Sequence, residues 1–572
     1  MVDNNSNTDE EEQSPMSTTR SVTMTRSPSA LEKHVQSCLT LTDPTLLRTM
    51  HVEDLLRGFA WVLGSSDCGE EHYKLSRPAD RANEFISHNW STPRADKFLS
   101  LALHYNFVPA MLFAAAAAII TFVLEFQGIL PCIHKEFFNF RSTGWIQVIG
   151  VVALSLGLCF HGDLAAALNC RSGPRLFLDR TCVCQTDAEL KRRGIANLAA
   201  ILYRSDTLVV LYTDVYLKKL WTVYEITMYL LIHPRGRLVF QPVVFAEVVL
   251  SCIFIVTVNR ACFAIYNGPW VQDRLLHHMK LDPELVSDQL WWFVTIPLCS
   301  IMTVALRKWA GEHAALDTGL RDFSIRHANC LSAEDRDLIE QNIAIYAKHA
   351  CVVGLEATRE EALTAFDALI NRQIRRIFLK RVGRRGIPYR YAVTMFSIYA
   401  FYALDAVAAL EPDKVSLRTV AVLIGYTSSV AFAIGPLAVA LNLQLSMCLI
   451  TYPPRRANFL VGLCTFVVYN GMLSVTWHYG CRAPYSDFHF SGLMISSVLL
   501  ILATAYAYRP TGDELDPPCK CILGEDGLRG RFASRTNLEA DPDSDGSLDS
   551  DNLQELVGHW GSSSSSSSSS SP

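Results

Sequence analysis

The chain has 572 residues, of which 50% are hydrophobic and only 19% are charged. Its 51 Lys and Arg residues and 56 Asp and Glu residues give a formal net charge of −5, which excludes a nucleic-acid-binding protein because such proteins carry a basic excess. The apolar residues gather in nearly uncharged windows of about 17–20 residues, long enough to cross a bilayer. The composition therefore excludes a soluble enzyme, a secreted disulfide scaffold and a fibrous repeat, and it predicts a multi-pass α-helical membrane protein embedded in lipid.

The 17 cysteines are too sparse for a disulfide framework, and their spacing matches no zinc-finger pattern. We therefore expect no bound metal and no required cofactor.

Apolar runs predict about eight membrane spans. They are residues 107–124, 144–160, 238–258, 290–306, 392–410, 419–441, 459–477 and 490–507. Lys and Arg are concentrated in the loops 161–237 and 307–391, and Arg384, Arg385 and Arg390 directly precede the fifth span. Because positively charged loops stay on the cytosolic side, we expect these loops and both termini to be cytosolic. The sequence does not indicate which membrane holds the protein.

The segments outside the spans predict three further regions. Residues 1–80 are expected to form a mostly disordered arm with short helices, and residues 508–572 an acidic, Ser-rich tail too polar to form a core. The loop 307–391 has apolar residues at helical spacing and a capping pair, Thr358 and Glu361, which predict a cytosolic helical domain.

Two segments beside the first pair of spans show the alternation of strands and helices typical of an α/β fold. Residues 84–88, 176–178 and 208–212 are short apolar strands, and the last is apolar on both faces, as in a buried parallel strand. Helical patterns follow at 195–202 and 216–232.

These patterns predict one cytosolic α/β module, formed by residues 81–106 and 161–237. A transmembrane hairpin, 107–160, splits the module in the sequence. A second hairpin, 238–306, and four further transmembrane helices, 392–507, complete the predicted organisation.

Short motifs in this module resemble Toll/interleukin-1 receptor (TIR) domains. Residues 85–94 (FISHNWSTPR) are similar to the first strand and the loop after it, and residues 177–180 (FLDR) to the second strand with its terminal aspartate. Residues 204–216 (RSDTLVVLYTDVY) resemble the third strand, and residues 221–226 (WTVYEI) the Trp-x-x-x-Glu motif of the next helix. Residues 179–187 also resemble fungal heterokaryon-incompatibility domains.

The resemblance implies that Ile86, Leu178 and Val210 meet in a single parallel sheet. It further implies membrane-associated signalling, in which copies of the protein self-associate through the TIR-like module into a homo-oligomer. Many TIR domains only act as scaffolds, so the resemblance leaves open whether this one is an enzyme.

In enzymatic TIR domains, the glutamate of the Trp-x-x-x-Glu motif assists cleavage of the nicotinamide–ribose bond of NAD. The resemblance gives this role to Glu225, with a supporting role for Trp221 one helical turn earlier. The substrate-binding residues that it implies are Phe85, Ser87, Arg94, Asp179, Ser205 and Tyr216. NAD would then be a substrate and not a bound cofactor.

A second reading of the sequence is a transporter or ion channel with a cytosolic regulatory domain. Ionisable residues within spans are costly and are often functional. Glu125, Glu247 and Asp405 fall in or at the ends of predicted spans, and Gly435 and Pro436 could break the sixth span and free backbone carbonyls for an ion.

Overall fold

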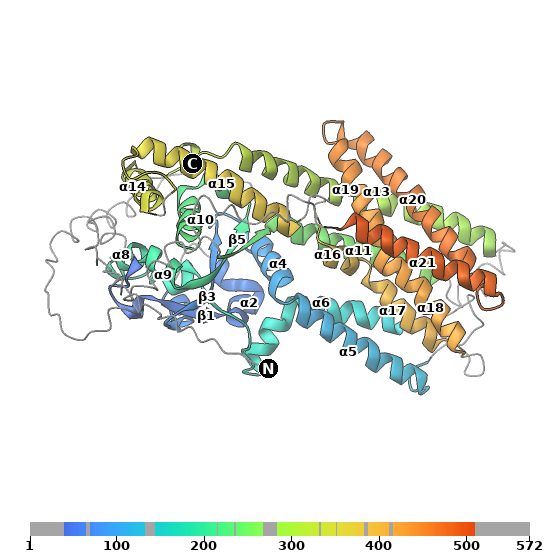
Figure 1. Ribbon diagram of the computed structural model, residues 1–572. Coiled ribbons are helices and arrows are strands. Elements are labelled where there is room, and N and C mark those ends of the chain that lie inside the picture. Colours follow the sequence, from blue (N-terminus) through green and yellow to red (C-terminus); the bar gives the residue numbers. More distant parts are fainter. Residues whose placement is uncertain are drawn as a thin grey trace, which may run out of the picture.

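The computed structural model describes residues 39–509, except for short internal gaps. These gaps are residues 65–68, 132–143, 214, 234–235, 267–282, 331–332, 350–351, 383–386 and 411–415. Residues 1–38 of the arm predicted at 1–80, and residues 510–572 of the predicted tail, lie outside the described residues. The prediction of a mostly disordered arm is wrong for residues 39–80, which contribute two strands, short helices and buried apolar side chains to the α/β module. The α/β module lies at one end of the molecule, and a bundle of long helices forms the other end (Figure 1).

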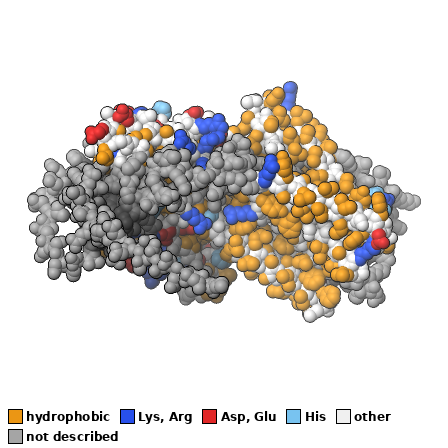
Figure 2. All heavy atoms as spheres, viewed as in Figure 1, with side chains coloured by type: hydrophobic (Ala, Val, Ile, Leu, Met, Phe, Trp, Pro, Cys, Tyr) orange, Lys and Arg blue, Asp and Glu red, His pale blue; other side chains and the backbone are white. Residues whose placement is uncertain are grey.

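The bundle contains seven described helices that are long and apolar enough to cross a membrane, or eight if a bent pair counts as one span. The seven are α5 (Phe107–Phe126), α6 (Trp145–Ala167), α11 (Val243–Tyr266), α13 (Pro283–Arg321), the continuous α18–η7–α19 (Leu417–Cys448), α20 (Pro454–Arg482) and α21 (Asp487–Ala507). Hydrophobic side chains cover the bundle, whereas Lys and Arg gather where it meets the module (Figure 2). The chain is thus built as a multi-pass helical membrane protein.

Most spans extend a few residues beyond the predicted ends, and three differ in ways that change the architecture. The third was expected to begin at residue 238, but Arg237–Pro242 form strand β6, and α11 begins at Val243. The fourth was expected to end at 306, but α13 continues as one helix of 39 residues to Arg321. The fifth is a bent pair, α16 (Tyr389–Met395) and α17 (Ser397–Ala408), with an angle of 50° between them.

The module is built on a six-stranded sheet with the order β2-β1-β4-β3-β5-β6. The strands are β1 (Arg48–His51), β2 (Arg77–Pro78), β3 (Ala82–His88), β4 (Arg175–Phe177), β5 (Ser205–Tyr212) and β6 (Arg237–Pro242). The central strand β3 pairs in parallel with β4 on one side and with β5 on the other, and β5 pairs in parallel with β6. Strands β1 and β2 extend the β4 edge in antiparallel fashion.

The expected single parallel sheet is present: Ile86 lies on β3 and Val210 on β5, and Leu178 directly follows β4. Phe85 lies opposite Phe177 on one side and Leu208 on the other, and Ser87 lies opposite Val210. Strands β1 and β2 were not predicted, because strands of four and two mostly polar residues carry no periodic signal of their own.

Helices cover both faces of the sheet and complete a three-layer arrangement. On one face α2 (Val52–Ala60) and α4 (Arg94–Tyr105) pack against Ile86, Leu178 and Val209. On the other face α9 (Leu198–Tyr203) and α10 (Leu220–Ile232) pack against Phe85 and Val210. Because the strands are buried on both sides, they are apolar without alternation, as parallel strands are.

The loop between the fourth and fifth spans forms helices α14 (Ala333–His349) and α15 (Arg359–Val382). The predicted capping pair is present: the backbone N–H of Thr358 donates to Glu361 Oε2 (2.7 Å), and the N–H of Glu361 donates to Thr358 Oγ1 (3.2 Å). Asn329, which follows α13, bonds to the backbone of Lys218 and Leu220 at the start of α10. The remaining short elements are η1 (Pro44–Leu46), η2 (Trp61–Leu63), α3 (Glu70–Lys74), α7 (Asp179–Cys182), α8 (Ala188–Ala196), η3 (Tyr216–Lys218) and η5 (Ile325–His327).

Candidate functional site

The strand order creates a switch point at the carboxyl end of β3. From β3 the chain continues to β4 on one side, then crosses to β5 on the other side. In open parallel sheets, ligands bind at such a point, outside the carboxyl ends of the strands. Ser87 and His88 end β3, Asp179 follows β4, and Glu225 lies on α10, which follows β5.

A chain of short hydrogen bonds joins β3 to α10 at this point. The Ser87 hydroxyl donates to Glu225 Oε2 at 2.5 Å, and the Tyr216 hydroxyl is hydrogen-bonded to Ser87 Oγ. Ser87 and Tyr216 are fully buried, whereas Glu225 is partly exposed. One hydroxyl therefore orients the carboxyl group from the buried side and leaves the other side open to solvent.

The electrostatics of Glu225 set it apart from an ordinary surface carboxylate. Burial, and then the nearby carboxyl group of Asp179, raise the pKa of Glu225 to about 8, against the lowering effect of the Ser87 hydrogen bond. Glu225 is therefore mostly protonated at neutral pH. A carboxyl group of this kind ionises readily when a positive charge approaches it.

Two buried cations lie beside Asp179. Lys97 on α4 is fully buried, and burial and the nearby Arg180 lower its pKa to about 8. Arg180 is 3% exposed, and its Nε and Nη1 atoms have no hydrogen-bond partner among the described residues. Buried guanidinium nitrogens are normally hydrogen-bonded. The Nε and Nη1 atoms of Arg180 are therefore unused donors.

Trp90 and His88 complete the edge. Trp90 donates from Nε1 to Asp179 Oδ2 (2.6 Å), and its ring stacks on the Arg180 guanidinium at 4.5 Å. His88 is buried, with Nδ1 3.9 Å from Asp179 Oδ1, and burial lowers its pKa well below the usual value. The imidazole is therefore neutral, and the charges at this edge come from Asp179, Lys97 and Arg180.

Four of the residues that the sequence analysis implied come together here, namely Ser87, Asp179, Tyr216 and Glu225. Trp221 shares the face of Glu225, because these are the two residues of α10 that are not buried.

Three other implied residues do not join this group. Phe85 is buried in the sheet and stacks on Phe177 at 4.8 Å. Ser205 is at the amino end of β5 and donates to the Ile201 carbonyl. Arg94 begins α4 beside the site, with an exposed side chain.

The sequence analysis missed the cationic half of the site. Trp90 and Arg180 lie inside the motifs that were recognised, so their position next to Ser87 and Asp179 was available as a signal. Lys97 gave none, because a lysine in the second turn of a helix is usually solvated. In the described part of the chain, no three His, Cys, Asp or Glu side chains are grouped so that they could hold a metal ion.

Comparison of the chain with protein-family models, with curated proteins and with solved structures gives no match. The interpretation of the site thus depends on its own geometry and chemistry.

A second polar region lies inside the helix bundle. Gln147 on α6 donates to Asp405 Oδ2 (2.5 Å) and accepts from Arg260 on α11 (3.3 Å). Arg260 also lies 4.1 Å above the Tyr402 ring. Asp405, which the sequence analysis singled out, is fully buried. A glutamine thus connects a carboxylate and a guanidinium from different helices.

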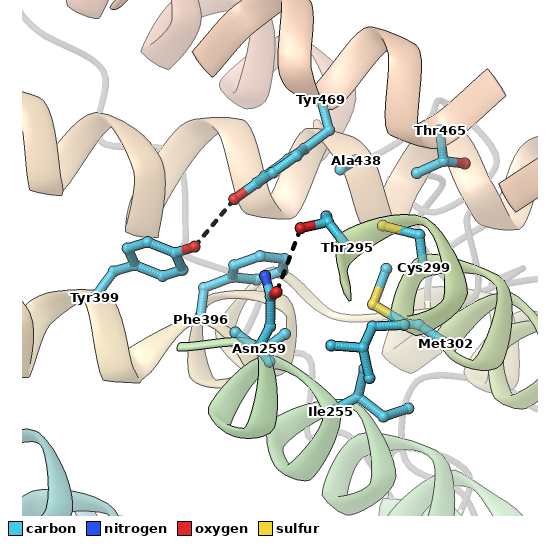
Figure 3. Close-up of a pocket in the computed structure, with 12 residues that line it drawn as sticks. Ile255, Asn259, Thr295, Cys299, Met302, Phe396, Tyr399, Ala438, Thr465 and Tyr469 are labelled. Atoms are coloured by element: carbon cyan, nitrogen blue, oxygen red, sulfur yellow. Dashed lines mark hydrogen bonds between the residues drawn. The ribbon is translucent and has the colours of Figure 1, made fainter. Parts of the chain in front are cut away.

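A small cavity of about 40 Å³ lies among α11, α13, α17, α19 and α20 (Figure 3). The Tyr399 and Tyr469 hydroxyls meet at 3.2 Å on one side of it, and Thr295 donates to Asn259 (3.4 Å) on another. Ile255, Met302 and other apolar side chains complete the lining. The cavity has room for about one or two water molecules.

The predicted helix break at Gly435 and Pro436 takes a different form. A π-helical turn, Val430–Ile434, precedes Gly435, and the helix continues. Hydroxyls from neighbouring helices occupy carbonyls in this region: Tyr389 donates to Phe432 (2.7 Å) and Tyr508 to Pro436 (2.9 Å). These carbonyls are therefore less available to an ion than the sequence suggested.

Proposed function

We propose that this protein is a membrane-embedded signalling protein whose α/β module cleaves the nicotinamide–ribose bond of NAD, with Glu225 as the catalytic carboxylate. The observation that carries the proposal is the hydrogen bond from Ser87 to Glu225 at the switch point of the parallel sheet. It supports the proposal because Glu225, whose pKa is raised, lies at the edge of the sheet where open parallel sheets bind ligands.

The proposed reaction needs one carboxylate and one water molecule. The C–N bond to nicotinamide breaks, its electron pair leaves with nicotinamide, and the ribose becomes an oxocarbenium-like species that water attacks. The products are nicotinamide, ADP-ribose and a proton. The positive nicotinamide ring lowers the pKa of Glu225 as it binds, so the carboxylate forms where positive charge then develops on the ribose.

The cations suit the other half of such a substrate. The unused donors of Arg180 and the ammonium group of Lys97 can pair with the negative pyrophosphate of a dinucleotide. Asp179 balances part of this charge in the free protein. Trp90, which is 41% exposed and stacks on Arg180, offers an aromatic surface at the rim of the site.

Signalling and self-association form the other part of the proposal. They are supported by the resemblance of the motifs to TIR domains and by the parallel order β4-β3-β5-β6. In this account the lipid bilayer holds the modules on one side, which we propose to be the cytosol, and a homo-oligomer brings them together.

The test is nicotinamide release from NAD by the full chain in lipid nanodiscs and, crowded, in vesicles. Glu225→Gln should abolish release, and Glu189→Gln, which changes an exposed glutamate on α8, should leave it unchanged. Absence of release at every protein density, or equal release by Glu225→Gln, would overturn the enzymatic proposal. Density-dependent release would support activation by self-association.

A second candidate function is transport through the bundle. It is favoured by the buried contact between Gln147 and Asp405 and by the polar groups around the cavity in Figure 3. It is weakened at Glu247, which pairs with Lys308 (2.7 Å). Ion or proton flux in liposomes that disappears in Asp405→Asn would support this function. Absence of flux with the wild-type protein would exclude it.

A further inference from the structure

An apolar pocket of about 220 Å³ lies where the α/β module meets the bundle. Three helices form its walls: α4 from the module, and α6 and α11 from the bundle. The lining residues are Phe98, Leu99, Ala102, Leu103, Val151, Leu154, Ser155, Leu158, Cys159, Leu250, Ile253, Phe254 and Thr257.

The pocket offers almost nothing to water. Its two hydroxyl groups are turned to their own helices: Ser155 donates to the Val151 carbonyl (2.9 Å), and Thr257 donates to the Ile253 carbonyl (2.7 Å). A water molecule in a buried site needs two to four polar partners, whereas apolar cavities of about 150 Å³ stay dry and accept apolar ligands. The chemistry of the lining therefore selects a hydrocarbon.

The surroundings indicate where that hydrocarbon comes from. Two of the three walls, α6 and α11, are long, apolar, membrane-length helices, so bilayer chains are the medium around them. Leu250 and Phe254 also line a second groove, between α11 and α13, and Phe254 is 68% exposed at this shared edge. The pocket thus adjoins an exposed apolar edge of α11, of the kind that lipid tails would cover in a bilayer.

We propose that the pocket binds one acyl chain of a bilayer phospholipid, which enters past Phe254 and lies against α4. The inference does not depend on the proposed function. Its consequence for the module is a direct contact between lipid and the helix that carries Lys97, because Phe98 and Leu99 directly follow this residue on α4. Without the chain, the apolar faces of α4, α6 and α11 would leave an empty space at the junction, with lost packing energy.

The test uses the full chain in vesicles of phosphatidylcholine whose acyl chain carries a photoreactive diazirine, followed by peptide mapping. We expect label on residues 98–103 of α4, with Leu499 on α21, which is 60% exposed, as the labelled reference. Leu99→Trp fills the pocket and should reduce the α4 label several-fold. Val152→Trp adds the same ring at a 50% exposed position of α6 that does not line the pocket and should not reduce it.

A second variant keeps the test informative if Leu99→Trp folds poorly. Phe254→Ala opens the proposed entrance at an exposed position and should increase the α4 label. Absence of label on α4 in the wild type while Leu499 is labelled, or equal α4 label in Leu99→Trp, would overturn the proposal. Loss of label on addition of excess free fatty acid, but not of excess phospholipid, would replace the proposed occupant by a free acid and so overturn the assignment.

Discussion

Ser87 Oγ lies 2.5 Å from Glu225 Oε2, although the two residues are 138 positions apart and a membrane hairpin separates them in the chain. The contact exists because β3 and β5 pair in parallel, with Ser87 opposite Val210. The insertion of α5 and α6 after α4 therefore leaves the sheet intact. The hairpin leaves the module and returns to it before β4, so the strands on either side of it become neighbours.

The Ser87 hydroxyl should control the pH dependence of the proposed activity. Its hydrogen bond stabilises the Glu225 carboxylate and holds its pKa down, so Ser87→Ala should raise that pKa further above 8. A hydrogen bond to a charged group contributes about 1.5–3 kcal/mol, which corresponds to roughly one to two pH units. The profile of kcat/KM against pH, which reports the free enzyme, should have its rising part shifted to higher pH by this amount.

The matched control is Ser205→Ala, which removes a buried serine hydroxyl at the opposite end of the neighbouring strand. It should leave the midpoint of the profile in place. An unchanged profile in Ser87→Ala, or the same shift in both variants, would show that Ser87 does not act on the titrating group.

Lys97 should reduce stability near neutral pH. Its folded-state pKa of about 8 lies below the ordinary 10.5, so the native state binds fewer protons than the unfolded state between these values. The cost of burying the charged form of Lys97 is therefore absent above pH 10.5. It grows as the pH falls from 10.5 to 8 and is fully present below pH 8. Lys97→Met should raise the free energy of unfolding at pH 7 by about 1–3 kcal/mol.

The measurement is unfolding of the detergent-solubilised protein at pH 7 and at pH 10, where the advantage of Lys97→Met should shrink. Lys74→Met, which changes an exposed lysine paired with Glu70, should alter stability little at either pH. A constant gain at both pH values would mean that hydrophobic contact, and not removal of a charge, produces the effect.

The sequence predicted much of the module because the central strands can be recognised from their own residues, without knowledge of their neighbours. Residues 208–212 are apolar on both faces, and this pattern identified β5 and its buried, parallel character. The spans were equally clear, since length and the absence of charge define them. Their ends were less clear at β6, where the apolar pattern continues from the strand into the membrane helix and hides the change at Val243.

Trp90 and Arg180 lie inside the recognised motifs, but the burial of the cations was not predictable from the sequence, because it arises from tertiary packing. Lys97 is unusual only because α4 lies against the sheet and the Trp90 segment, and Arg180 only because β4 ends beneath Trp90. Charge pattern along one helix cannot reveal such burial. The prediction that Ser87 and Ser205 both bind the substrate was misled by a shared local pattern, because both serines flank apolar strand residues. Ser87 lies near the carboxyl end of β3 and Ser205 at the amino end of β5, so the parallel pairing of these strands puts the two serines at opposite ends of the sheet.

The hairpin that interrupts the module should tolerate no added volume where its helices cross. A Cβ atom at Gly157 of α6 would lie 2.8 Å from the Ala110 Cα atom of α5, and backbone cannot move away as a flexible side chain can. Gly157→Ala should therefore lower stability by about 1–3 kcal/mol. Gly471→Ala on α20, where a Cβ would meet nothing within 4 Å, should be neutral or stabilising. Thermal unfolding in one detergent compares the two, and equal effects would contradict close packing at Gly157.

The buried contact between Gln147 and Asp405 should couple α6 to α17 strongly. Gln147→Leu removes the donor to Asp405 Oδ2 and the acceptor used by Arg260, so two charged groups lose a partner inside the bundle. A hydrogen bond to a charged group contributes about 1.5–3 kcal/mol, so Gln147→Leu should lower the free energy of unfolding by at least this amount. Asp405→Asn should cost less, because its amide oxygen can still accept from Gln147. The control Gln127→Leu, at an exposed position just after α5, should stay within about 0.5 kcal/mol of the wild type.

Reversible unfolding in mixed micelles of the two single variants and of Gln147→Leu/Asp405→Asn completes a double-mutant cycle. We expect the double variant to cost clearly less than the sum of the singles, because a neutral asparagine tolerates the loss of its donor better than a carboxylate does. Additive costs would mean that Gln147 and Asp405 act independently, and the contact would then support neither the packing of α6 on α17 nor a transport pathway through Asp405.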